Sequence, residues 1–440
     1  MRRMIRRLLP LFAALLLPLA GPPAANPLTS PRLPVPVEGA LLTADRSVPA
    51  LSFVVTPLRN ASDDPGQAYV AEGLTDYVTR DLSRIHGSFV IARASAAALA
   101  DAKPAELAGE FAVRYVISGT AGTQGGRLAV ELSLFDAATD KTGWSGKFAR
   151  DAGALGALRN DILARLAEET GAPPGAVGAL PMQGREPGEA LLRARALLIR
   201  PQNPVTVAEA RRLLEGALKE GASRDAEDGL AAIHLLEAVS GWSPAPAQDL
   251  RRARQLIDAA IAGDPGDARA QALNVALLRL AKHPAEALAA YEAAVAADPN
   301  LAESHAEIGR VKIDLGQAGD TVPAIEKALA LSPRDPQRVL WLSFAGMAEL
   351  YAGRPKAAVP WLERSAALMP SFVNARIWLA ASHQLAGATQ KAKAAAQEAA
   401  ELSPGLTLAR VARQLPGDTA ETRRRSEEIL DALRRAGIAE

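Results

Sequence analysis

Residues 284–299 read PAEALAAYEAAVAADP, an alanine-rich run that ends with the pair Asp298-Pro299. A closing proline of this kind recurs 34, 34, 37 and 34 residues apart, in Asp264-Pro265, Asp298-Pro299, Ser332-Pro333, Met369-Pro370 and Ser403-Pro404. A period of about 34 residues is typical of helix-turn-helix solenoid repeats. The phased prolines therefore predict an array of helix pairs in the second half of the chain.

A second pattern precedes each proline. An alanine, a larger apolar residue four positions later and a small residue three further on recur in Ala253/Ile257/Ala260, Ala287/Tyr291/Ala294, Ala358/Leu362/Ser365 and Ala392/Ala396/Ala399, with Thr321/Ile325/Ala328 as a looser copy and Ala210/Leu214/Ala217 upstream. These offsets place all three residues on one helical face, where small side chains let a neighbouring helix approach closely. Proline then ends the helix, because it restricts the residue before it and has no backbone N–H.

At these positions the chain resembles the tetratricopeptide repeat (TPR) family, and the family's first-helix glycine is present as Gly309 and Gly346. The chain departs from the family pattern because most copies lack the early aromatic residue. It also carries three extra residues around Arg334-Asp335-Pro336. The resemblance implies a TPR-type α-solenoid. A generic alanine-rich helical bundle is the alternative, but it does not explain why the prolines are in phase.

Composition excludes several classes of protein. At 440 residues, with 49% hydrophobic and 22% charged residues, the chain is expected to form two or more globular domains. A net charge of +1 gives no overall argument for nucleic acid as a partner. The absence of cysteine excludes disulfides, thiolate metal sites and cysteine nucleophiles.

The amino-terminal region predicts export. Met1 to Arg7 carries four arginines, and the 13 mostly apolar residues from Leu8 to Ala20 follow. As a helix, this run would span ~20 Å against a hydrocarbon core of ~30 Å, so residues 1–25 are predicted to be a signal peptide and the protein to be periplasmic. An uncleaved inner-membrane anchor at residues 8–20 is the alternative. Residues 26–47, with four prolines, are predicted to be an extended linker.

Residues 48–170 predict a small α/β domain. Expected strands are Leu51–Pro57, Ser88–Ala92, Tyr115–Ser118, Leu128–Phe135 and Trp144–Phe148. Helices are expected around residues 69–85, over Ala94–Phe111 with a break at Pro104, and over Leu155–Thr170. The resulting order is β-α-β-α-β-β-β-α. Residues 171–186 are predicted to be a linker, residues 187–414 the helical repeats, and residues 415–440 a capping helix that covers the apolar side of the last repeat.

Several segments of the α/β region resemble the TolB-like domain that accompanies tetratricopeptide repeats in bacterial proteins. They are Tyr69-Val70-Ala71-Glu72-Gly73-Leu74-Thr75, Leu82-Ser83-Arg84-Ile85, Phe89-Val90-Ile91-Ala92-Arg93, Val113-Arg114-Tyr115-Val116 and Asp136-Ala137-Ala138-Thr139. In such proteins the pair often follows an adenylate cyclase or winged-helix DNA-binding domain. We expect neither within the 47 residues before this region. The resemblance therefore implies the regulatory half of such a protein without its effector half.

No catalytic, cofactor-binding or metal-binding residue is predicted. Phosphate-binding, HExxH and GxSxG motifs are absent, and the five histidines, His86, His234, His283, His305 and His383, show no i, i+3 or i+4 spacing. The pair Asp63-Asp64 could hold a cation, but helix capping explains it more simply. We therefore expect no enzymatic activity and no cofactor.

The remaining candidate site is the inner face of the repeats. By resemblance to the family, a protein or peptide partner would contact positions on the first helix of each pair, here Arg269, Arg279, Glu303, Arg310, Ser343, Met347, Asn374, Ile377 and Gln384. The arginines suit an acidic segment or a carboxylate terminus, although they are equally consistent with a solvated surface.

These observations leave two main hypotheses for function. The first is a non-catalytic scaffold of the bacterial cell envelope. The second is a regulatory module, of the adenylate cyclase or transcriptional regulator type, that acts on a separate effector in the cytoplasm. An enzyme with an unrecognised site in the α/β domain is the third. The identity of the partner and the oligomeric state do not follow from the sequence.

Overall fold

The computed structural model describes residues 48–62, 64–83, 85–173, 188–200, 202–221, 224–264, 267–280 and 283–440, although the side chains of residues 268, 279 and 280 are not described. The predicted signal peptide and the 26–47 linker lie outside these residues. So do most of the 171–186 linker, Asp63, and Pro265 of the proline series. Within the described ranges, no helix combines the length and the hydropathy that a membrane span requires.

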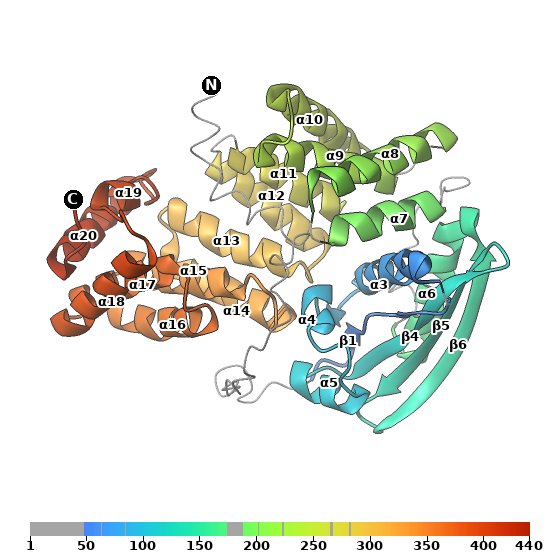
Figure 1. Ribbon diagram of the computed structural model, residues 1–440. Helices are drawn as coiled ribbons and strands as arrows, with labels where there is room; N and C mark the ends of the chain where they lie inside the picture. The colour runs from blue at the N-terminus through green and yellow to red at the C-terminus, as the bar shows by residue number, and fades with distance from the viewer. Residues whose placement is uncertain are drawn as a thin grey trace. The chain divides into compact units, whose positions relative to one another are not determined.

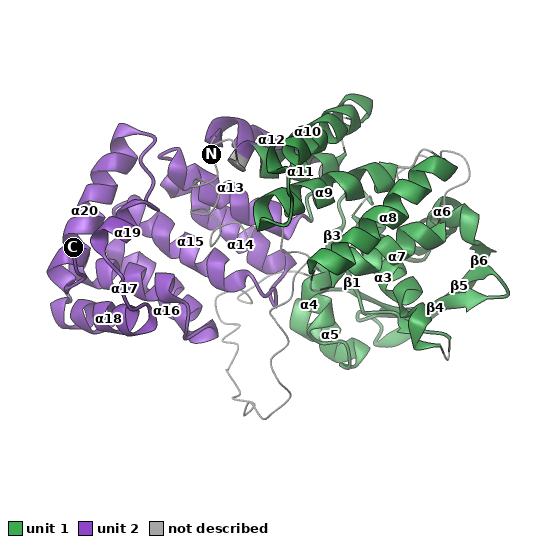
Figure 2. Cartoon of the chain, turned by 45° about the horizontal axis from the view of Figure 1, so that its top comes forward, with its two compact units in different colours: residues 1–277, 297–300 green, residues 278–296, 301–440 purple. Residues whose placement is uncertain are grey.

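The chain forms two compact units, coloured separately in Figure 2. Unit 1 runs to Leu277 and also includes Ala297–Asn300, whereas unit 2 comprises Leu278–Ala296 and Leu301–Glu440. Unit 1 therefore joins the sheet domain and the first repeat helices in a single compact body. The predicted domain boundaries at residues 170 and 187 remain predictions.

A mixed sheet organises the first part of unit 1 (Figure 1). Its order is β3-β1-β4-β5-β6, with the short β2 also paired to β4. The strands are β1 (Ser52–Val55), β2 (Arg59–Asn60), β3 (Phe89–Val90), β4 (Tyr115–Gln124), β5 (Arg127–Asp136) and β6 (Lys141–Asp151). β1 pairs in parallel with β3 and β4, and the β4-β5-β6 meander is antiparallel. Gly125 and Gly126, with φ of 57° and 77°, form the two-residue turn between β4 and β5.

Helices pack on both faces of this sheet, because successive strand residues point to opposite sides. Val54 and Val116 face α4 (Arg93–Ala97) and α5 (Pro104–Phe111) in one apolar cluster. On the other face lie α3 (Ala68–Leu82) and α6 (Leu155–Glu169), which contact each other. There Tyr115 stacks on Phe53, with ring centroids 5.5 Å apart.

The predicted β-α-β-α-β-β-β-α order is confirmed apart from the short additional strand β2, with differences in length. Pro104 begins α5 and separates it from α4, as expected. β4 extends six residues beyond the predicted Ser118, because its hairpin with β5 continues in register from Tyr115↔Asp136 to Gln124↔Arg127. Asp64 accepts a hydrogen bond from Gly66 N (2.8 Å) at the start of the turn that leads into α3, which is the predicted capping role.

The rest of the chain consists of helices in the order expected for TPR-type pairs. They are α7 (Gly188–Ile199) and α8 (Pro204–Glu220), α9 (Arg224–Ser240) and α10 (Pro246–Gly263), α11 (Ala268–Leu280) and α12 (Pro284–Ala297), α13 (Ala302–Asp314) and α14 (Thr321–Leu331), α15 (Arg338–Tyr351) and α16 (Pro355–Leu368), and α17 (Val373–Leu385) and α18 (Thr389–Leu402). The short α19 (Leu408–Ala412) and α20 (Ala420–Ala436) follow. The predicted α/β plus all-α class is confirmed.

The phased residues occupy the positions that the sequence predicts. Pro299, Pro333, Pro370 and Pro404 each follow the last residue of a second helix by two positions. The small residues of the repeat pattern are buried. Gly346 permits close helix contact, because a Cβ atom at this position would lie 2.4 Å from Leu362 Cγ in α16.

Candidate functional site

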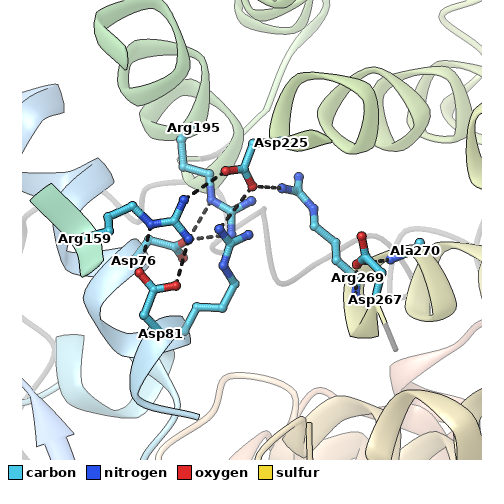
Figure 3. Close-up of polar contacts among 9 residues, drawn as sticks. Asp76, Asp81, Arg159, Arg195, Asp225, Asp267, Arg269 and Ala270 are labelled. Carbon is cyan, nitrogen blue, oxygen red and sulfur yellow. Dashed lines mark hydrogen bonds and ion pairs between the residues drawn. The ribbon is translucent and has the colours of Figure 1, made fainter. Parts of the chain in front are cut away.

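Unit 1 contains a network of buried and half-buried charged side chains, which we call the charge network (Figure 3). It comprises Asp76, Arg80, Asp81, Arg159, Arg195, Asp225 and Arg269. The first three lie on α3, and the others lie on α6, α7, α9 and α11. The network therefore connects two helices of the sheet domain to three repeat helices.

The most buried pair in the network is Arg159 with Asp81. Arg159 donates from Nε and Nη2 to the two carboxylate oxygens of Asp81, and both N–O distances are 2.8 Å. The side chains of Arg159 and Asp81 are only 6% and 4% exposed. The guanidinium carbon of Arg159 also lies 4.1 Å from the ring centroid of Tyr77. A bidentate arginine stacked on an aromatic ring is held in one orientation. This pair is therefore a rigid joint between α3 and α6.

Asp225 is the centre of the network, because it interacts with several arginines. Arg159 Nη1 and Arg80 Nη2 each donate to a carboxylate oxygen of Asp225 at a distance of 3.1 Å, and Arg269 Nη1 lies 4.0 Å from Asp225 Oδ1. Burial alone would raise the pKa of Asp225, but the surrounding arginines, Arg80 first, hold that pKa far below its usual range. In the same way, Arg195 donates to Asp76 over 2.6 Å and lowers the pKa of Asp76.

Asp228, one helical turn after Asp225 on α9, behaves differently. Its side chain is buried, at 4% exposure, and burial raises its pKa to about 7 despite the nearby Arg269. Asp228 is therefore a carboxyl group that changes charge near neutral pH at the edge of the network.

The charge network has the chemistry of a structural joint. Each carboxylate of the network accepts hydrogen bonds from arginine, and arginine keeps its proton. The sequence interpretation did not identify it. The sequence feature that could have revealed the network is a charged residue on an apolar helix face. Asp81 lies between Val78 and Leu82, and Arg159 lies between Leu158 and Ile162.

The nine residues predicted to bind a partner are divided between the units. Arg269 belongs to unit 1, and Arg279, Glu303, Arg310, Ser343, Met347, Asn374, Ile377 and Gln384 belong to unit 2. In unit 2, α13, α15 and α17 lie in succession as the first helices of their pairs, and α15 contacts both others. Ser343 and Ile377 are buried, whereas Asn374 is exposed. Gln384 Oε1 is buried without a hydrogen-bond partner among the described residues.

The predicted arginines are already paired within the chain or are not described. Arg310 donates to Glu307 (2.9 Å) and Asp314 (2.7 Å) on its own helix, α13. Arg269 lies in the charge network, and the side chain of Arg279 is outside the description. Because Arg269 and Arg310 make these interactions, replacing them is expected to change stability as well as any binding.

One group of side chains has the composition of a metal site. His234, Glu237 and Asp249 place ligand atoms within 4.8 Å of one another. His234 Nδ1 donates to Asp249 Oδ1 (2.6 Å), and Arg211 donates to Glu237 and to His234 Nε2 (3.3 Å). A guanidinium thus occupies the position from which a cation would bind the imidazole and carboxylate. We interpret the group as an ion-paired contact among α8, α9 and α10.

The sequence of this chain is similar to that of a known protein over only part of its length. No family model matches the chain. A putative adenylate cyclase 3 of Rhizobium meliloti (strain 1021) is 28% identical over 221 residues, which cover 48% of this chain and 38% of the relative. The chain thus matches less than half the length of this curated relative.

Among solved structures, similarity is found to the type IV pilus biogenesis factor PilW, to YrrB, described as a TPR protein with an unusual peptide-binding site, and to MamA. Their identities are 21%, 20% and 16%, with TM-scores of 0.37, 0.37 and 0.34. The alignments cover 46%, 46% and 39% of this chain and 90%, 98% and 91% of those chains.

Proposed function

We propose that this chain is a non-catalytic protein-interaction scaffold of the bacterial cell envelope. Its first-helix face, formed by α13, α15 and α17, would bind a segment of a protein partner. The sheet domain, for which the TolB-like assignment is part of this proposal, would be held on the first repeats by the charge network.

The succession of α13, α15 and α17 carries the proposal. Stacked helix pairs expose a row of first helices that can contact a long segment of a partner. Asn374 is exposed on this row. Met347 is half-buried on α15 and could contact a partner, whereas Ser343 and Ile377 support the face from within.

Affinity capture with the full chain tests this function. The Asn374→Arg variant places a long cation on the face, and the Gln390→Arg variant makes a matched amide-to-arginine change at the exposed second residue of α18. We expect an envelope protein captured by the wild type to be lost with Asn374→Arg and kept with Gln390→Arg. An alkaline-phosphatase fusion tests the location, and a silent fusion would contradict the envelope assignment.

A regulatory module of an adenylate cyclase system is the second candidate. The match to a putative adenylate cyclase favours this candidate. Because the match covers only 38% of that relative, the candidate concerns regulation and not cyclase activity itself. This candidate requires a cytoplasmic location and a separate effector. Cellular cyclic AMP that changes when the chain is removed, together with a silent phosphatase fusion, would support it over the scaffold.

A further inference from the structure

The C-terminal helix α20 packs on the first-helix face of unit 2, at α17 and at the C-terminal end of α15. Its N-cap residue Thr419 is next to Gly316, which follows α13, since a Cβ atom on Gly316 would lie 3.1 Å from Thr419 Oγ1. Further along, Ser426 bonds to Tyr351 of α15. The helix also packs on α17, beside which Figure 1 shows it. α20 thus packs on α17 and α18 of the last pair and also reaches the C-terminal end of α15 and the turn after α13.

The contact between α20 and this face is amphipathic. The buried residues of α20 are Thr422, Ser426, Ile429, Ala432, Leu433 and Ala436, which share one helical face. Ile429, Leu433 and Ala436 belong to the same apolar cluster as Ile377 and Trp378 of α17. Amphipathic helices that bind in a groove of a partner protein use the same spacing, with buried side chains three, four and seven residues apart.

Polar contacts fix the register of α20. Ser426 Oγ donates to the carbonyl of Pro416 (2.6 Å), so it accepts the hydrogen bond from Tyr351 Oη (2.7 Å). Beyond the helix, Leu408 N donates to the carbonyl of Ala439 (2.7 Å). The position of α20 on the repeats is therefore specific.

The sequence of α20 supports the helix independently of this contact. Thr419 and Thr422 form a reciprocal capping box, and Gly437 ends the helix in the left-handed conformation. The outer face carries ion pairs one turn apart, including Arg424 with Glu421 and Arg435 with Asp431. A helix supported by its own caps and pairs can separate from the face as a unit.

We propose that the first-helix face binds an amphipathic helix of a partner in the place of α20, and that α20 is the intramolecular competitor for it. This inference rests on the proposed scaffold function and names its partner class. The partner helix presents small and apolar residues at the spacing of Ser426, Ile429, Leu433 and Ala436. Binding in this way requires α20 to leave, so α20 lowers the apparent affinity for every such helix.

The test uses a fluorescent peptide of residues 419–438 as the probe and the full chain as the receptor, with binding followed by fluorescence anisotropy. In the Ile429→Asp/Leu433→Asp variant the chain's own α20 is released, and we expect it to bind the peptide at least tenfold more tightly than the wild type. Glu427→Ala changes only the exposed side of α20 and should bind the peptide as the wild type does.

A milder variant keeps the test valid if the double substitution unfolds the chain. Ser426→Ala removes the hydrogen bond from Tyr351 to the chain's own helix but leaves it available to the peptide. Loss of one hydrogen bond of ordinary strength should tighten peptide binding about fivefold. Circular dichroism verifies that each variant is folded. Equal affinities for the wild type and the folded variants, or no binding by any of them, would overturn the competitor role.

The outcomes also separate this inference from the proposed function. If the peptide binds in the expected order but no variant captures an envelope protein, the competition stands and the scaffold function fails. If a partner is captured equally well by the wild type and both α20 variants, the scaffold stands and the competition fails.

Discussion

Asn300 accepts a hydrogen bond at Oδ1 from the backbone N–H of Val90, over 2.9 Å, although the two residues are 210 positions apart. Val90 lies on β3, the end strand of the sheet, and its N–H points away from β1, because the neighbouring residues 89 and 91 donate to β1 and its flanks. Asn300 also donates from Nδ2 to the carbonyl of Ser88 (3.3 Å). One asparagine side chain therefore pairs with backbone groups at an open sheet edge.

Replacing Asn300 with alanine is expected to destabilise unit 1 by ~1–3 kcal/mol, because the buried N–H of Val90 loses its acceptor. Asn300→Asp keeps an acceptor for Val90 but buries a carboxylate oxygen against the carbonyl of Ser88, so a loss at least as large is expected. Urea denaturation of the full chain measures both. Asn374→Ala, at an exposed position, serves as control. An Asn300→Ala variant as stable as this control would show that the edge contact contributes nothing.

Arg159→Met is expected to cost ~3–5 kcal/mol, because it leaves the carboxylate of Asp81 buried without its partner. Arg165→Met, on the same helix but 42% exposed, should cost less than about 1 kcal/mol. The double variant Asp81→Asn/Arg159→Met should be more stable than the sum of its single changes predicts. Additive losses in this double-mutant cycle would contradict a coupled pair.

The buried carboxyl of Asp228 predicts a pH dependence opposite to that of a salt-bridged aspartate. Its pKa of about 7 in the folded chain lies above the ordinary value of 3.8. Between these values the unfolded chain loses a proton that the folded chain keeps, so this group lowers stability as the pH rises through that window.

Asp228→Asn removes this titration. The stability of the variant relative to the wild type should therefore increase by up to about 3 kcal/mol between pH 5 and pH 8. Unfolding is measured at several pH values above 5. This avoids the acidic range in which the network carboxylates with lowered pKa values begin to protonate. Exposed Asp258→Asn controls for the substitution itself. A relative stability that is flat across the range would exclude the raised pKa.

Gly346→Ala is expected to destabilise unit 2 by ~1–3 kcal/mol, because the added Cβ would lie 2.4 Å from Leu362 Cγ and force α15 and α16 apart. Gly216→Ala is the matched control, since a Cβ there meets nothing within 4 Å and α8 is helical at this point. That change should stabilise the chain by ~0.5–1 kcal/mol. Thermal unfolding of both variants distinguishes helix packing from helix propensity.

Local patterns in the sequence were sufficient to predict most of the elements. The proline at the end of each second helix acts through its own backbone, so Pro299, Pro333, Pro370 and Pro404 end helices where expected. Strand boundaries were less accurate. β6 extends to Lys141 and Asp151 because it pairs along the length of β5, and the pairing partner of a strand is not a local property.

The candidate site was only partly accessible from the sequence. Arg310 was predicted to face a ligand, whereas in the structure it bonds to Glu307 and Asp314 on its own helix. Arg269 was also predicted to contact a ligand, but in the structure its guanidinium lies 4.0 Å from the carboxylate of Asp225 on α9. Whether either contacts a partner stays a prediction. The spacing of a charged residue identifies its helix face, but not which other helix supplies its counterion.

The sequence by itself determined the alternation of strands and helices, the repeat period and the small residues that let helices pack closely. These features depend on backbone propensities and on side chains a few positions apart. Only the tertiary structure decided that Asp225 joins arginines from three helices, that Asn300 pairs with the edge of β3, and that α20 packs on α17 and the end of α15. The physical reason is that these contacts bring together residues far apart in the chain, and their energies depend on burial that no local pattern specifies.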